Sequence, residues 1–112
     1  MSYRLTKRSV TELEEIYNFI ANDKQNPAGA EVVENYLFEA FRKIGLDPAR
    51  CGGRARPEIT TRPYKFLTVR KCIVAYDDRT TPVWIVGIVG GRRNLAALFT
   101  ADPSLAGDED RQ

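Results

Sequence analysis

Apolar residues in the first half of the chain recur every three or four positions, which is the spacing of one face of a helix. The first such stripe predicts a helix over residues 10–22. Ser9 and Glu12 match an S-x-x-E capping box, in which each side chain satisfies a free N–H group of the first turn. The stripe consists of Val10, Leu13, Ile16, Tyr17 and Ile20, and Phe19 widens it.

A second helix is predicted over residues 27–44. Asn26 is a favoured N-cap, Pro27 suits the first turn, and Gly45 fits the position just past the end. Its apolar stripe is Val33, Leu37, Ala40, Phe41 and Ile44. Because only residues 23–26 separate the two helices, we expect them to pack as an antiparallel hairpin.

The apolar pattern changes to that of strands after Pro63, following a loop over residues 47–56. Candidate strands cover residues 64–69, 71–76 and 82–89, and a short first strand covers residues 3–6 at an edge of the sheet. The continuous apolar run before Gly90 is typical of a strand covered on both faces. Gly87 within it indicates a bulge or a closely approaching helix. Tyr76 and Trp84 are expected in the core.

This order of elements predicts an α+β fold, in which an N-terminal strand and an antiparallel helical hairpin pack on a small antiparallel sheet, β-α-α-β-β-β. A chain of 112 residues suits one compact domain, which we place at residues 1–100. Residues 101–112 contain Asp, Gly and Ser and few apolar groups, so we expect a flexible tail.

The composition limits the kinds of catalytic and metal sites that the chain can form. The chain has no histidine and only two cysteines, Cys51 and Cys72, which argues against a zinc site and excludes histidine-based triads. No cofactor is expected. No apolar run approaches the roughly 20 residues of a membrane helix, and the N-terminus lacks a secretory signal. We therefore expect a cytoplasmic protein with reduced cysteines and no direct membrane binding.

Charge is unevenly distributed along the chain. The net charge is only +2, but residues 50–94 hold ten basic and three acidic residues, while the segments on either side are net acidic. The basic segment is therefore the part expected to meet a negatively charged partner.

Four segments, taken in order, resemble the ParE/RelE superfamily of toxins from bacterial type II toxin–antitoxin modules. "ELEEIYNFI" (12–20) is similar to the family's acidic-Leu-x-x-Ile helix, and "DPARCG" (47–52) to its Pro-to-Gly loop. "CIVAY" (72–76) resembles a strand that ends in Tyr, and "VWIVGIVGGRRN" (83–94) a strand that leads into Gly-Arg-Arg. The resemblance spans residues 3–99.

The chain departs from the family pattern at three places. Gly90 replaces a histidine that ParE-like members often carry before Gly-Arg-Arg, and Asn94 replaces an acidic residue. Three residues separate Pro48 from Gly52, where the family often has two. The resemblance therefore defines the fold more closely than the subfamily.

The resemblance implies one of two activities: ParE-like members inhibit DNA gyrase, and RelE-like members cut mRNA on the ribosome. Metal-free RNA cleavage needs a base, cations that stabilise the phosphorane, and an acid for the leaving group. Arg92 matches the arginine that RelE-like nucleases carry after the last strand. Their tyrosine, however, falls at Leu98 or Phe99, and their sheet arginine falls at Ile73.

These apolar positions, together with the long helical hairpin, favour a ParE-like toxin that is not an enzyme. The resemblance implies that such a toxin arrests growth and serves in plasmid stabilization. One alternative is a ribosome-dependent mRNA endonuclease with its catalytic groups relocated to Lys65, Lys71 or Tyr64. Another is an inactive relative that retains only antitoxin binding.

Arg92 and Arg93 are the main candidates for a target-binding surface. An arginine fork suits carboxylates and phosphates alike. Either the two are solvated charges that pair with Asp77, Asp78 or the tail, or they bind the target, and the resemblance favours binding. Because neighbours on an extended backbone point apart, one can serve structure and the other function. The predicted surface comprises Arg92, Arg93, Arg62, Lys65 and Lys71.

The resemblance also implies a cognate antitoxin that wraps a partly helical, disordered tail around the toxin. Contact with DNA would then occur only through the antitoxin complex. The candidate antitoxin-binding residues are Tyr17, Phe19, Tyr36, Phe38, Arg54 and Arg56. The alternative is that the four aromatic residues stabilise the hairpin and the two arginines lie in a solvated loop.

Overall fold

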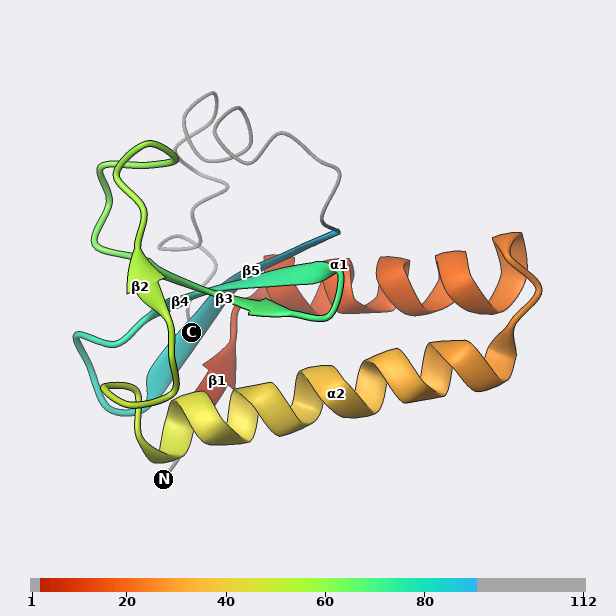
Figure 1. The fold of residues 1–112 in the computed structure, drawn as a ribbon, viewed down its shortest axis with the longest axis horizontal. Helices are drawn as coiled ribbons and strands as arrows, with labels where there is room; N and C mark the ends of the chain where they lie inside the picture. The colour runs from red at the N-terminus through yellow and green to blue at the C-terminus, as the bar shows by residue number, and fades with distance from the viewer. Residues whose placement is uncertain (1–2, 91–112) are drawn as a thin grey trace.

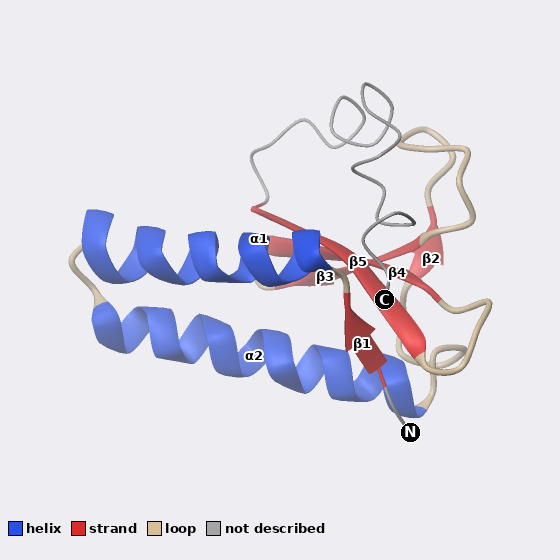
Figure 2. Ribbon diagram, turned by 180° about the vertical axis from the view of Figure 1, so that it is seen from behind, coloured by secondary structure: helices blue, strands red, loops and turns tan. Residues whose placement is uncertain are grey.

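The computed structural model describes residues 3–90 and confirms the α+β class (Figure 1). Its elements are β1 (Tyr3–Leu5), α1 (Lys7–Asn18), the π-helical turn η1 (Phe19–Asp23), α2 (Pro27–Leu46), β2 (Arg54–Ala55), β3 (Lys65–Val69), β4 (Cys72–Asp77) and β5 (Val83–Gly90). The predicted tail lies outside the described residues. The two long helices run antiparallel beside the sheet (Figure 2).

The five strands form one mixed sheet in the order β1-β5-β4-β3-β2. The meander β3-β4-β5 is antiparallel, as predicted, and β1 pairs parallel with β5. A parallel neighbour is compatible with the long helical connection between β1 and the other strands, since parallel strands need a crossover of a dozen residues or more. β1 lies at an edge of the sheet, where it was expected.

Helix α1 begins earlier than predicted, and the predicted capping box does not form. Thr6 is the N-cap, and its Oγ1 accepts a hydrogen bond from the backbone N–H of Ser9 at 3.2 Å. Ser9 lies within the first turn and donates from its hydroxyl to the carbonyl of Ile85 at 2.7 Å. Glu12 accepts from the backbone N–H of Ile88 at 2.9 Å. Both polar side chains therefore bind the sheet, and Ser9 Oγ also accepts a hydrogen bond from the hydroxyl of the N-cap Thr6 at 3.1 Å.

Helix α2 begins as predicted and ends later. Asn26 caps it through a 2.9 Å hydrogen bond from the N–H of Gly29, and Pro27 is its first residue. The helix continues through the buried Gly45 to Leu46. No helix in residues 3–90 combines the length and apolar character that crossing a membrane requires.

The end of α1 also differs from the prediction. The π-helical turn η1 forms the tip of the hairpin, and Phe19 within it is 51% exposed instead of widening the buried face. Val10 is 44% exposed as well. The buried stripe of α1 is therefore narrower than its apolar pattern suggests.

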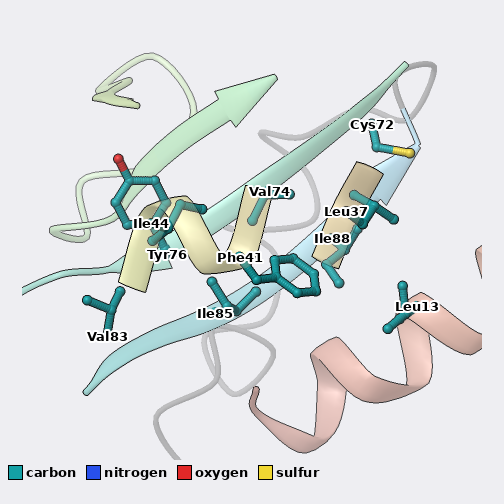
Figure 3. Close-up of a cluster of buried hydrophobic side chains, with 10 residues drawn as sticks. All are labelled: Leu13, Leu37, Phe41, Ile44, Cys72, Val74, Tyr76, Val83, Ile85 and Ile88. Carbon is teal, nitrogen blue, oxygen red and sulfur yellow. The ribbon is translucent and has the colours of Figure 1, made fainter. Parts of the chain in front are cut away.

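Strand β5 is covered on both faces, as its apolar run predicted. On the helix side lies a cluster of Leu13, Leu37, Phe41, Ile44, Cys72, Val74, Tyr76, Val83, Ile85 and Ile88 (Figure 3). On the other side lie Ile59, Tyr64, Phe66, Ala75, Val86 and Val89. Tyr76 is fully buried, as expected, and Trp84 is only partly buried at the second cluster.

A β-bulge lies next to Gly87, which confirms one of the two alternatives for that residue. Ala75 pairs with Gly87 and Tyr76 pairs with Ile85, so Val86 is an extra residue on β5. An extra residue reverses the alternation of side chains beyond it. Ile85 and Ile88 therefore both belong to the helix-side cluster, although they are three positions apart.

The loop predicted over residues 47–56 contains the short strand β2, which pairs with β3. Before β2, Cys51 and Gly53 lie against the ring of Tyr76. The Sγ atom of Cys51 is 3.2 Å from the Tyr76 hydroxyl, and a Cβ atom at Gly53 would overlap the Tyr76 hydroxyl and ring. Only glycine fits beside this buried tyrosine.

We expect Gly53→Ala to lower the free energy of unfolding by about 1–3 kcal/mol, since overpacking forces buried groups apart. Urea unfolding followed by circular dichroism measures the change. Gly90→Ala is the matched control, because a Cβ there meets nothing within 4 Å. A loss for Gly53→Ala no larger than for Gly90→Ala would contradict the packing around Tyr76.

Candidate functional site

The sheet has two chemically different ends. Arg70 and Lys71 form the turn between β3 and β4, and Gly90, the last residue of β5, pairs with Cys72 beside that turn. We call this end, defined by Arg70, Lys71 and Gly90, the turn end. The turn between β3 and β4 and the end of β5, which are far apart in sequence, therefore lie side by side.

An exposed aromatic and cationic surface joins the turn end to α2. The guanidinium carbon of Arg70 lies 4.1 Å from the ring centroid of Tyr36, a distance at which a cation is attracted to the ring face. Tyr36 and Val32 are each 47% exposed, and their spacing of four residues puts them on one helix face. We call Val32, Tyr36 and Arg70 the Tyr36 surface.

The opposite end of the sheet holds paired charges. Lys65, at the start of β3, donates from Nζ to Asp78 at 2.7 Å. Asp77 is fully buried and accepts from the side chain of Arg79 at 2.9 and 2.7 Å and from its backbone N–H at 3.1 Å. Lys65 and Asp77 are thus each held in a separate ion pair.

The structure does not bring all the predicted target-binding residues together. Lys71 is exposed at the turn end, whereas Lys65 begins β3 at its other end, and the strand itself is about 13 Å long at the usual rise per residue. Arg62 is partly buried in the loop before β3. Arg92 and Arg93 lie outside the described residues. Their role in target binding stays a prediction. Among the described members, Lys71 lies nearest to the end of β5.

The four predicted aromatic antitoxin contacts are spread over several surfaces. Tyr36 and Phe38 are two positions apart, which is about 200° around a helix, so they face opposite ways. Phe38 is 38% exposed and packs edge-on against Phe41 with ring centroids 5.7 Å apart. Phe19 is at the hairpin tip with Lys24 Nζ 5.5 Å from its ring centroid, and Tyr17 is partly buried.

The two predicted arginine contacts also differ. Arg54 is exposed on the edge strand β2, and Arg56 forms a 3.0 Å ion pair with Glu58. The predicted sets omitted Val32 and Arg70, which belong with Tyr36. Helical spacing could have revealed Val32 as a neighbour of Tyr36. No local signal in the sequence indicates that Arg70, in the turn between β3 and β4, contacts Tyr36 of α2.

The described residues offer little for acid–base catalysis. Burial, together with the contact to Cys51, raises the pKa of Tyr76 far above its ordinary value. Tyr64 is buried, and Ile73 packs against the second cluster. Within residues 3–90, no group of His, Cys, Asp and Glu side chains could hold a metal ion.

Comparisons with known proteins agree with the fold. The family model described as "ParE toxin of type II toxin-antitoxin system, parDE" matches residues 3–95. A solved structure titled "Chromosomal ParDE TA system from P. aeruginosa" superposes with a TM-score of 0.62 at 17% identity, covering 80% of this chain and 95% of that chain. No curated protein sequence matches the chain.

Stability should fall at alkaline pH because of Tyr76. Its raised pKa keeps the native hydroxyl protonated, whereas the unfolded hydroxyl ionises near pH 10, so the free energy of unfolding drops as pH rises beyond about 10. Tyr76→Phe should remove up to about 1.4 kcal/mol per pH unit of that slope. Urea unfolding between pH 7 and 11 measures it, with Tyr36→Phe, at an exposed ring, as the control. Parallel curves for the wild type and Tyr76→Phe would contradict this assignment.

Proposed function

The chain belongs to the ParE toxins of type II toxin–antitoxin systems, and we propose that it arrests growth by inhibiting DNA gyrase in the cytoplasm. The observation that carries the proposal is the family match over residues 3–95, which includes every described residue. The likeness to the ParDE structure supports the fold alone.

The proposed toxin acts by binding and is not an enzyme. Metal-free RNA cleavage requires positioned acid, base and cationic groups. The sheet position of a RelE-like arginine is Ile73, partly buried among apolar residues, and the nearby Tyr76 is fully buried. The endonuclease and the inactive relative therefore enter as alternative outcomes of the experiment below.

The proposed target-binding surface centres on Arg92 and Arg93, and it includes Lys71, which lies at the turn end of the described sheet. Lys71 is exposed, and Gly90, two residues before Arg92, ends β5 next to it. Guanidinium groups bind carboxylates or phosphates through paired hydrogen bonds, which suits a protein target that carries acidic groups or bound DNA. Lys65 and Arg62 contribute less, because Lys65 is paired with Asp78 and Arg62 is partly buried.

The proposed antitoxin-binding region includes the Tyr36 surface. Half-exposed Val32 and Tyr36 offer apolar area, and Arg70 offers a charge that attracts an acidic partner. Aromatic and arginine side chains of this kind dominate the energetics of many interfaces. Phe19, Phe38, Tyr17, Arg54 and Arg56 remain candidate peripheral contacts, since a wrapping segment can reach several surfaces.

The gyrase proposal is tested with purified protein in a DNA supercoiling assay. We expect inhibition by the wild type, and the double variant Arg92→Ala, Arg93→Ala should need at least about tenfold more protein, as for the loss of about 1.4 kcal/mol of binding. The control Arg42→Ala, Arg50→Ala removes two exposed charges elsewhere and should inhibit as the wild type does. Cleavage of ribosome-bound mRNA without gyrase inhibition would replace this proposal by the endonuclease. Neither activity, with antitoxin binding retained, would indicate the inactive relative.

Antitoxin binding is tested by calorimetry with the product of the neighbouring open reading frame. Tyr36→Ala and Arg70→Ala should each raise the Kd by about 10- to 100-fold, corresponding to about 1–3 kcal/mol, because both truncate a central contact. Val10→Ala is the matched control, an exposed apolar residue on α1 outside the proposed region. Equal effects of all three substitutions would count against the Tyr36 surface.

A further inference from the structure

The turn between β3 and β4 has an arginine at a position that favours glycine. Val69 pairs with Cys72, so the turn consists of two residues, Arg70 and Lys71. Arg70, the first of them, has a φ of 58°, in the left-handed region. Two-residue hairpin turns with a positive φ at the first position favour glycine, because the Cβ atom of most other residues crowds the neighbouring carbonyl oxygen. A large side chain is therefore attached to strained backbone.

The contact that Arg70 makes does not explain why the strain is tolerated. At a positive φ, a residue other than glycine lowers the folding equilibrium constant by more than about two- to fivefold, even after the freedom of glycine in the unfolded chain is counted. The Arg70 guanidinium carbon lies 4.1 Å from the Tyr36 ring centroid, and an exposed cation–ring contact contributes a factor of about two to five. The contact at best cancels the strain. Strain that does not stabilise the fold is often found at functional sites.

The Tyr36 ring orders the charge of Arg70 and leaves it accessible. The ring belongs to α2 and the arginine to the turn, so two rigid elements determine where the guanidinium lies. Arg70 is exposed, and within residues 3–90 no carboxylate forms an ion pair with it. A guanidinium presents its N–H groups as a planar fork that can bind both oxygens of a carboxylate. Because the side chain is already ordered, binding such a group costs less conformational entropy.

The surroundings of Arg70 define the chemistry of the partner. Lys71 beside it is exposed as well, so the turn carries two positive charges. Val32 and Tyr36 on α2 are each 47% exposed and add apolar area next to this charge. The complementary partner is an acidic segment that also carries apolar side chains. An apolar or basic segment would cover the arginine without pairing its charge, which is unfavourable.

We propose that Arg70 is the specificity-determining residue of the antitoxin-binding region, where it binds an aspartate or glutamate carboxylate of an acidic antitoxin segment. The strained turn is kept because it holds this arginine over Tyr36. Apolar side chains of the same segment cover Val32 and the exposed part of the Tyr36 ring. This inference rests on the proposed antitoxin binding and names the partner group that the Tyr36 surface selects.

The test uses two substitutions of the same residue in the full chain. Arg70→Gly removes both the charge and the strain, whereas Arg70→Lys keeps the charge and the strain but loses the planar fork. Arg50→Gly is the matched control, because it removes an arginine whose side chain is 87% exposed and whose φ is not positive. The readouts are urea unfolding, the Kd for the product of the neighbouring open reading frame by calorimetry, and the NMR resonance of the Arg70 Nε–H group.

For Arg70→Gly we expect an unfolding equilibrium constant no higher than that of the wild type, together with a Kd at least about tenfold higher, as for the loss of a central contact. Arg70→Lys should raise the Kd by about three- to tenfold, because a point charge replaces a paired fork. Arg50→Gly should unfold about two- to fivefold more readily, since glycine frees the unfolded chain, with a Kd within about threefold of the wild type. The Arg70 Nε–H resonance should shift when the partner binds.

Three outcomes would overturn the inference while antitoxin binding itself stands. The first is an Arg70→Gly variant that loses more stability than Arg50→Gly or does not fold, since Arg70 would then support the fold. The second is a stable Arg70→Gly variant with an unchanged Kd. The third is an Arg70→Lys variant that binds as the wild type does, because a carboxylate would then not need the fork. If the wild type does not bind the neighbouring product at all, the proposed antitoxin binding fails, and the inference fails with it.

Discussion

The hydrogen bonding of α1 to the free edge of β5 is the constraint on which the rest of the structure depends. β1 covers only the first residues of β5, and Ser9 and Glu12 satisfy backbone groups further along. This arrangement fixes the rotation and axial position of α1, because both side chains must point at the strand. α2 then packs beside α1 and buries Leu37, Phe41 and Ile44 against the sheet.

The bulge at Val86 belongs to the same arrangement. The extra residue turns Ile88 towards the helices, where its side chain joins the core while its N–H reaches Glu12. A regular strand would alternate without interruption and turn the side chain at this position to the other face. The bulge therefore allows Ile88 both to pack its side chain in the core and to donate its backbone N–H to Glu12.

Paired and exposed charges lie at opposite ends of the sheet. At one end, Lys65 pairs with Asp78, and Arg79 pairs with the buried Asp77, which consolidates the structure. At the turn end, Lys71 is exposed and Arg70 lies over the ring of Tyr36. An exposed charge and the Tyr36 surface therefore lie together at the turn end.

Local signals in the sequence were sufficient for α2, with its Asn26 cap and its stripe through Phe41, and for the strands of the meander. They also predicted a bulge or a close helix at Gly87 and the family to which the chain belongs. They could not show that Ser9 and Glu12 bind β5, because those contacts join residues 76 positions apart, and S-x-x-E looks the same whether it caps a helix or anchors a sheet. The same limit applies to the stacking of Arg70 on Tyr36, the pairing of Lys65 with Asp78, and the parallel pairing of β1. Periodicity records which side of an element is buried, whereas only the tertiary structure decides which distant polar group each side chain meets.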